Sequence, residues 1–291
     1  MILNYLGPEG SFSHSAALEL RSRLGPSSTL AGLSTVEAVV RSVAGSEASV
    51  PTLGLVPYYN FLEGLVPEYI DLIYEFRLQV DGLVRLPIQL AAGGFAADEP
   101  APQILSHPKA LAQVSDFVHA RFRNATLTPV SSTSDAARMV AERKSGIAIA
   151  SEGALERFQV PVLARNVGNL RHGKHNFTDL FVVKRRDVQV SLQLGEPNHA
   201  LIAITPSIDR PGLLAELLGQ FHFYGLDIAK IHSRPALDWV ESAAEPQMFY
   251  LEVKCAPHAE PLRRCAEALQ YGFGGNGHTA ELVRVLGGFR V

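Results

Sequence analysis

The chain has 291 residues, of which 47% are hydrophobic and 19% are charged, so it can form two or three folding units with buried cores. A formal net charge of -3 argues against a binder of nucleic acid or membrane surfaces, because such proteins carry an excess of basic residues. Polar residues interrupt every apolar run before the ~18 residues that a membrane span needs. The two cysteines, Cys255 and Cys265, fit no disulfide framework or metal spacing, so we expect a cytoplasmic protein.

The first part of the chain alternates short apolar strands with amphipathic helices, which favours α/β units and a largely parallel sheet. Strands are predicted at residues 2–6 and 52–57. Ser11 or Ser13 can cap a helix over residues 14–24, because a hydroxyl there accepts from the free amides of the first turn. A further helix is predicted over residues 67–76, opened by a proline whose missing amide is unimportant at a helix start.

Two extended segments, residues 77–90 and 162–166, look like crossings to and from a second lobe. Between them the same alternation predicts strands at 103–106, 126–130 and 146–150 and helices at 108–122 and 134–143, and a strand at 181–184 then completes the first lobe. We therefore predict a clamshell like that of type 2 periplasmic binding proteins, with parallel-rich sheets and the ligand between the lobes. Lobe 1 would take about residues 1–80 and 165–186, and lobe 2 about residues 81–164.

A charged run at residues 184–187 marks a predicted boundary between a domain over 1–186 and one over 187–291. The elements predicted beyond it are a strand at 199–205, a helix at 212–224, strands at 227–233 and 247–254, a helix at 261–271 and a strand at 282–286. This βαββαβ order is the ferredoxin-like plan. The plan alone leaves dimerisation and ligand sensing both open.

Residues 55–66 read Leu-Val-Pro-Tyr-Tyr-Asn-Phe-Leu-Glu-Gly-Leu-Val. This stretch resembles the Val-Pro-x-Glu-Asn-Ser-x-Glu-Gly-x-Val signature of prephenate dehydratases. Asn60 and Glu63 keep the motif, whereas Tyr59 replaces a glutamate and Phe61 a serine. Four further segments match motifs of the same family in the same order, and they are residues 7–17, 106–113, 132–137 and 148–151.

The C-terminal part is similar to the ACT regulatory domain of that family, whose signatures are Gly-Ala-Leu, matched near Gly212, and Glu-Ser-Arg-Pro, matched at residues 232–235. The resemblance implies a homodimer or homotetramer and an aromatic amino acid, phenylalanine, as ligand. Leu213 replaces the alanine and His232 the glutamate, so we expect a smaller ligand cavity. The candidate regulatory residues are Gly212, Leu213, Leu214, Ser233, Arg234 and Pro235.

The resemblance implies prephenate as substrate, a dianion with a ring carboxylate, a pyruvyl carboxylate and a ring hydroxyl. The family carries Thr-Arg-Phe at the dehydration step, where this chain has Thr178, Asp179 and Leu180. An aspartate cannot pair with a carboxylate as a guanidinium does. We therefore expect Asp179 either to point away from the substrate or to meet a replacement cation in the basic run of residues 171–175, from His172, Lys174 or His175.

The aromatic residues Tyr58, Tyr59 and Phe61 would make one wall of the cleft more apolar, which favours loss of CO2 from a desolvated carboxylate. Our first hypothesis is a non-aromatising prephenate decarboxylase, similar to those of antibiotic biosynthesis, that forms a dihydro-4-hydroxyphenylpyruvate. The alternatives are a prephenate dehydratase that forms phenylpyruvate for phenylalanine biosynthesis, and a catalytically inactive, amino-acid-sensing relative. Neither activity requires a cofactor, and we expect no metal and no nucleic-acid partner.

The residues of the expected site come from four of the five matching segments, residues 7–17, 55–66, 106–113 and 132–137, and from residues 176–179. The candidate catalytic residues are Thr178, Tyr59, Glu63 and Asn60. The candidate substrate-binding residues are Ser11, Tyr58, Phe61, Ser106, His107, Ser132, Thr133, Asn176 and Asp179. His14 and His107 are weaker candidates for a catalytic acid, because a histidine after a turn more often forms hydrogen bonds with the backbone.

Overall fold

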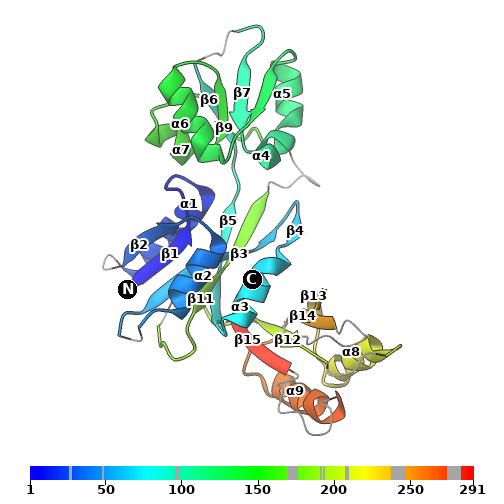
Figure 1. The fold of residues 1–291 in the computed structure, drawn as a ribbon. Helices are drawn as coiled ribbons and strands as arrows, with labels where there is room; N and C mark the ends of the chain where they lie inside the picture. Colours follow the sequence, from blue (N-terminus) through cyan, green and yellow to red (C-terminus); the bar gives the residue numbers. More distant parts are fainter. Residues whose placement is uncertain are drawn as a thin grey trace.

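The computed structural model of the chain describes residues 1–25, 28–47, 49–95, 99–169, 176–190, 192, 194–206, 210–236, 247–273 and 283–291. It has two α/β lobes and a C-terminal unit that lies against the first lobe on the side away from the second (Figure 1). The predicted fold class is confirmed: a two-lobed α/β clamshell followed by a βαββαβ unit.

The first lobe contains the chain from its N-terminal strand to the first crossing, and one returning strand. Its elements are β1 (Ile2–Leu6), α1 (Phe12–Leu24), β2 (Thr29–Leu33), α2 (Val36–Ala44), β3 (Thr52–Asn60), β4 (Gly64–Leu65), α3 (Pro67–Glu75), β5 (Gln79–Pro87) and β11 (Phe177–Lys184). Strand β1 pairs in parallel with β2 and β3, whereas β11 runs antiparallel between β3 and β5. Strand β5 stays in this sheet to Pro87, beyond the lobe boundary predicted near residue 80.

The second lobe has its own five-stranded sheet in the order β10-β6-β9-β7-β8, covered by helices on both faces (Figure 1). Its elements are β6 (Ala91–Gly94), β7 (Gln103–Ser106), α4 (Pro108–Gln113), α5 (Ser115–Arg121), β8 (Thr126–Pro129), α6 (Thr133–Arg143), β9 (Ile147–Ala150), α7 (Glu152–Arg157) and β10 (Val162–Ala164). The single helix predicted over residues 108–122 is wrong, because the chain breaks at Val114 between α4 and α5. At this break the β-branched side chain of Val114 is fully buried and packs in the core of the lobe.

The C-terminal unit has the predicted βαββαβ order. Its elements are β12 (His199–Ile204), α8 (Leu213–Phe223), β13 (Ile228–Pro235), β14 (Gln247–Val253), α9 (Glu260–Phe273) and β15 (Val283–Phe289). Its strands lie in the order β13-β14-β12-β15, with helices α8 and α9 on one face and the first lobe on the other. The glycine-rich stretch after α9, which we interpreted as a loop, lies outside the described residues from 274 to 282.

The sheets of the first lobe and of the C-terminal unit are joined edge to edge, so that the order continues β15-β5-β11-β3-β1-β2. The junction is the parallel pairing of Gly287 with Val80. Gly287 has a φ of 137°, and a Cβ there would lie 2.0 Å from the Val80 carbonyl oxygen. Only a residue without a side chain fits this close approach of two backbones.

Changing Gly287 therefore tests how strongly the junction supports the fold. We expect Gly287→Ala to lower the free energy of unfolding by at least ~2 kcal/mol, because it combines a clash with a strained φ. The matched control is Gly219→Ala in the exposed interior of α8, where a Cβ meets nothing within 4 Å and should stabilise by up to ~1 kcal/mol. Urea denaturation of both variants measures the difference, and equal midpoints would contradict the role given to the junction.

Candidate active site

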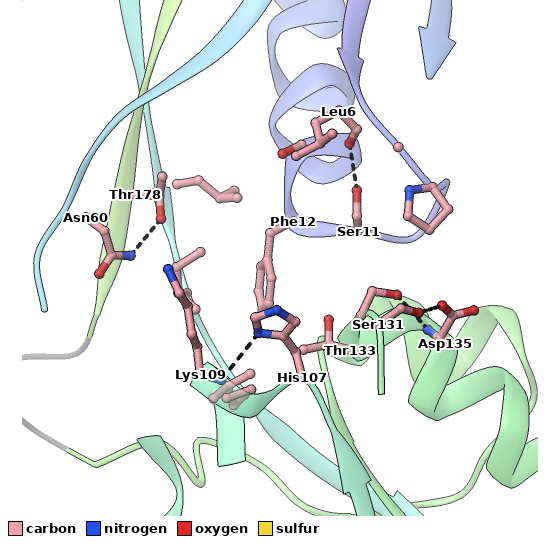
Figure 2. Close-up of a pocket in the computed structure, with 18 of the residues that line it drawn as sticks. Leu6, Ser11, Phe12, Asn60, His107, Lys109, Ser131, Thr133, Asp135 and Thr178 are labelled. Carbon is pink, nitrogen blue, oxygen red and sulfur yellow. Dashed lines mark hydrogen bonds between the residues drawn. The ribbon is translucent and has the colours of Figure 1, made fainter. Parts of the chain in front are cut away.

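A cavity of about 510 Å³ lies between the two lobes and is lined by residues of both. The first lobe contributes the turn between β1 and α1 and the cavity-facing ends of β3 and β11, and the second lobe contributes the first turns of α4 and α6 (Figure 2). The crossings beside it are held together, because the amide of Ile88 donates to the carbonyl of Asn176 at 2.8 Å. The cavity thus lies at the hinge between the lobes.

Two helices of ordinary length begin at this cavity. Helix α1 is capped by Ser11, whose Oγ accepts from the His14 amide at 3.2 Å, and α6 is capped by Ser132, whose Oγ accepts from the Asp135 amide at 3.0 Å. The caps leave other first-turn amides without helical acceptors, and both helix dipoles direct positive potential at the cavity. Such ends favour anions, and Ser11, Ser132 and Thr133 all line the cavity.

A directed hydrogen-bond chain reaches the cavity from the turn after β3. The Asn60 Oδ1 atom accepts from the amides of Leu62 and Glu63 at 3.0 and 3.3 Å, which assigns the Nδ2 atom as the donor to Thr178 Oγ1 at 2.9 Å (Figure 2). Since the Thr178 oxygen accepts this bond, its own proton is free to be donated to a ligand. Asn60 and Thr178 both line the cavity.

Asn176 lies two residues before Thr178 and is 6% exposed. Its Nδ2 atom donates to Gln113 Oε1 at 3.2 Å, whereas its Oδ1 atom is buried without a partner among the described residues. Both side chains line the cavity. A buried acceptor without a donor is costly, so a ligand with a hydroxyl group would satisfy it.

An apolar part of the lining comes mainly from Phe12, Leu86, Ile88, Leu90 and Leu180. The cavity therefore combines hydrogen-bonding groups at several sides with a patch that can contact a carbon ring. Within the described ranges, no three His, Cys, Asp or Glu side chains converge as metal ligands. No described helix is long and apolar enough to cross a membrane.

The comparisons with known proteins agree with this architecture. A family model described as prephenate dehydratase matches residues 3–188. The chain belongs to the prephenate dehydratase family. This membership confirms the predicted resemblance and makes the protein an enzyme of the lyase class. A bifunctional chorismate mutase/prephenate dehydratase of Aquifex aeolicus is 27% identical over 286 residues, which are 98% of this chain and 72% of that protein.

Solved structures share the fold over the whole chain. The prephenate dehydratase of Staphylococcus aureus superposes with a TM-score of 0.77 at 24% identity, covering 100% of both chains. That of Arthrobacter aurescens, solved with L-Phe, has a TM-score of 0.78 at 22% identity and covers 100% of this chain and 90% of its own. A quorum quenching acylase matches equally well, with a TM-score of 0.78, 24% identity and coverage of 99% and 97%. Fold alone therefore does not decide the reaction.

The aromatic residues that distinguish this chain from the family motif do not line the cavity, so their predicted place on a wall of the cleft is wrong. Tyr58 is buried against the C-terminal unit, where its hydroxyl donates to Glu252 at 2.5 Å, and burial beside that carboxylate raises the pKa of Tyr58. The Tyr59 ring lies 5.0 Å from the Lys230 ammonium, and Phe61 stacks on Phe177.

Asp179 points away from the cavity, which is one of the two outcomes expected from sequence. It is 2% exposed and forms a two-point ion pair with Arg85, whose Nε and Nη2 lie 2.7 and 2.9 Å from its carboxylate oxygens. The pairing raises the pKa of Arg85. The replacement cations considered above, His172, Lys174 and His175, lie outside the described residues.

The remaining predicted residues divide between the cavity and its surroundings. Ser106 is fully buried and donates to the Ile149 carbonyl at 2.6 Å, so it supports the second lobe and does not line the cavity. His107 does line it, and its Nδ1 atom accepts from the Lys109 amide at 3.3 Å. Glu63 lies at the rim, with Oε2 2.5 Å from Lys109 Nζ.

His14, a weaker candidate, binds backbone as expected. Its Nδ1 atom accepts from the Gly10 amide at 3.0 Å, and it stacks on Tyr5 instead of lining the cavity. Burial lowers the pKa of His14. Sequence reasoning missed two polar lining residues in the segment over residues 106–113, Lys109 and Gln113. The resemblance contained this signal, because the motif that residues 106–113 resemble is Ser-His-Pro-Gln-Ala-Leu-x-Gln. This chain has Lys109 in place of the first glutamine and keeps the second as Gln113.

The predicted regulatory residues also separate into two groups. Gly212, Leu213 and Leu214 line a cavity of about 180 Å³ at the start of α8. Arg234 instead pairs with Asp71 on α3 of the first lobe at 2.6 Å, and the Tyr250 hydroxyl donates to the same carboxylate at 2.8 Å. Ser233 and Pro235 alternate with Arg234 along β13 and are exposed.

The pair between Arg85 and Asp179 gives a stability prediction. We expect Arg85→Ala to lower the free energy of unfolding by about 2 kcal/mol, less than the ~3–5 of a fully buried pair because the Arg85 side chain is 46% exposed. The exposed pair of Arg23 with Glu19 provides the control, since Arg23→Ala should change stability by less than ~0.5 kcal/mol. Guanidinium denaturation measures both, and equal effects would show that Asp179 does not depend on Arg85.

Proposed function

We propose that the protein is a prephenate dehydratase, which converts prephenate and one proton into phenylpyruvate, CO2 and water. The observation that carries this proposal is the hydrogen bond from Asn60 to Thr178, because it leaves the Thr178 proton directed at a ligand in the cavity. The C–O bond to the ring hydroxyl breaks as the ring carboxylate leaves as CO2, and the departing oxygen takes up the proton. A donor at that oxygen stabilises the charge that develops on it.

Asn176 supports the same arrangement from the other side of the hydroxyl. Apart from its carboxyl groups, which are ionised at neutral pH, prephenate has one hydrogen-bond donor, the ring hydroxyl. The orphan Asn176 Oδ1 is an acceptor for it in the same cavity as Thr178. The hydroxyl would then accept from Thr178 and donate to Asn176, which fixes its orientation for departure. Hydrogen bonds linked in one direction also polarise one another.

The remainder of the cavity fits the two other parts of the substrate. The free amides in the first turns of α1 and α6, with the hydroxyls of Ser132 and Thr133, supply donors for carboxylates, whereas the Ser11 hydroxyl already donates to the Leu6 carbonyl at 3.2 Å. The apolar patch that includes Phe12 and Leu180 supplies a contact surface for the ring. Dehydratase relatives, including the bifunctional enzyme of Aquifex aeolicus, favour the same reaction.

The other two hypotheses lose their main motivation. Non-aromatising decarboxylation rested on aromatic residues and a misplaced acid in the cleft, and Tyr59, Phe61 and Asp179 do not line the described cavity. One observation still favours it, since Leu180, which replaces the motif phenylalanine, does line the cavity. An inactive relative was suggested by the lost arginine, but that position faces Arg85 on the other side of the strand.

One assay separates the three functions. We expect the purified protein, incubated with prephenate at neutral pH, to release CO2 and to form phenylpyruvate with its ultraviolet absorbance and mass. A product that has lost CO2 and kept its oxygen would instead identify the decarboxylase. Measurable binding of prephenate without turnover would identify the inactive relative.

The role of Thr178 gives a mutational prediction. Thr178→Val removes the hydroxyl at constant shape and should lower kcat at least tenfold, a loss of at least ~1.4 kcal/mol of transition-state stabilisation. The matched control is Thr178→Ser, which keeps the hydroxyl and should retain most of the rate. Equal rates for the two variants would show that the Thr178 hydroxyl plays no part in the reaction.

We further propose that the C-terminal unit is an ACT domain that binds an aromatic amino acid and joins two chains, as homodimer or homotetramer, in the cytoplasm. The cavity beside Leu213 and the L-Phe complex of the Arthrobacter aurescens relative support the ligand. The exposed aromatic residues Phe223 and Tyr271 support association, and both cysteines are free thiols, as a reducing compartment requires.

Phenylalanine binding can be measured directly. We expect millimolar phenylalanine to raise the melting temperature by binding the native state, while Leu214→Asp, which places a charge in that cavity, should abolish the shift. Alanine serves as the control ligand. A shift that survives in the variant would locate the amino-acid site elsewhere.

A further inference from the structure

The cavity between the lobes contains few formal charges for a site that receives a dianion. Among the described lining residues other than histidine, they belong to Lys109 and Asp135. Asp135 accepts from Ser131 and pairs with Arg138 at 3.2 Å, and these contacts lower its pKa. Its charge is therefore already compensated within α6, and Lys109 is left as the lining cation of the described part of the chain.

Lys109 lies in the first turn of α4, and its side chain extends from the second lobe toward Asn60 and Thr178 (Figure 2). Its Nζ atom is 2.5 Å from Oε2 of Glu63, a residue of the first lobe whose amide donates to Asn60 Oδ1. The ammonium group is therefore held at the corner of the cavity where the hydroxyl of Thr178 is directed. The ion pair spans the opening between the lobes.

This ion pair is easily exchanged. The Lys109 side chain is 64% exposed and that of Glu63 is 37% exposed, so water screens the attraction between them. A lysine ammonium on a flexible stem can change partners without moving the backbone. A ligand carboxylate that enters the cavity carries the same chemical group as Glu63 and competes for the same cation.

We propose that Lys109 binds one carboxylate of the substrate, and that Glu63 holds Lys109 in the empty cavity and releases it when the dianion enters. This inference rests on the proposed function for the identity of the substrate. It also identifies a cation inside the cavity although the position of the motif arginine carries Asp179 on the opposite face of β11. The family motif has glutamine at position 109, so this charge is a feature of this chain.

The ion pair between Lys109 and Glu63 could instead serve only to hold the two lobes together. A second ion pair between the lobes provides a matched control for this alternative. Arg157 of α7 pairs with Glu9 of the first lobe at 2.6 Å, with side chains 43% and 59% exposed. This pair joins the same two lobes with similar exposure, but neither residue lines the cavity. A purely structural role would make the two pairs respond alike.

The experiment measures binding without turnover by using Thr178→Ala as the parent protein. Isothermal titration with prephenate is performed on this parent and after adding Lys109→Gln or Arg157→Gln. We expect Lys109→Gln to raise the Kd at least tenfold and to flatten its dependence on salt, because a charge-assisted contact is lost. Arg157→Gln should change the Kd less than twofold. A Kd within twofold of the parent for Lys109→Gln, or an equal loss in both variants, overturns the inference.

Glu63→Gln in the same parent tests the release step. Because it removes the competitor for Lys109, we expect prephenate to bind two- to fivefold more tightly, and unchanged or weaker binding contradicts the exchange. Melting temperatures within a few degrees of the parent confirm that these exposed substitutions leave the fold intact.

Product analysis of the wild-type protein keeps the two proposals apart. If phenylpyruvate forms and Lys109→Gln leaves the Kd unchanged, the proposed function stands and the inference fails. If prephenate binds through Lys109 but phenylpyruvate is not formed, the inference stands and the proposed function fails. A parent protein that does not bind prephenate overturns both.

Discussion

The candidate site depends on the alternation of side chains along β11, a constraint that every strand imposes. Thr178 and Leu180 face the cavity between the lobes, and Asp179 between them faces the back of the sheet, where Arg85 neutralises it. The replacement of the motif arginine by Asp179 reverses a charge, but this side chain points to the opposite face of the strand from Thr178. The negative charge therefore lies outside the cavity. The hydrogen bond from Asn60 then fixes the one hydroxyl on this strand that a ligand can reach.

Much of the site was predictable because its parts are local. A hydroxyl before a helix predicts a cap, and Ser11 and Ser132 are caps at the cavity. The motif frame also placed Asn60 and Thr178 in one site, and the structure gives them a mutual hydrogen bond. The βαββαβ order followed from periodicity alone, since each of its elements is long enough to show a clear pattern.

The placement of Tyr58 was not predictable from the sequence, and a β-bulge explains why. Thr178 and Asp179 pair with Asn60 and Tyr59, but Leu180 pairs with Pro57, so Tyr58 is an extra residue in β3. A bulge resets the alternation, and both tyrosines turn toward Lys230 of the C-terminal unit. Period-two reasoning on residues 55–66 cannot locate such a reset, because it depends on the partner strand.

The continuous sheet also determines whether the C-terminal unit can be removed from this protein. Tyr58, Phe181 and Phe289 pack in one core that spans the first lobe and the C-terminal unit, and the Asp71 carboxylate accepts hydrogen bonds from Arg234 and Tyr250. A truncated chain that stops near residue 188 would expose this apolar surface to water. It would also leave the Asp71 carboxylate without its counter-ion, Arg234. The C-terminal unit therefore completes the core of the first lobe, and a domain swap at this boundary must preserve both packed faces.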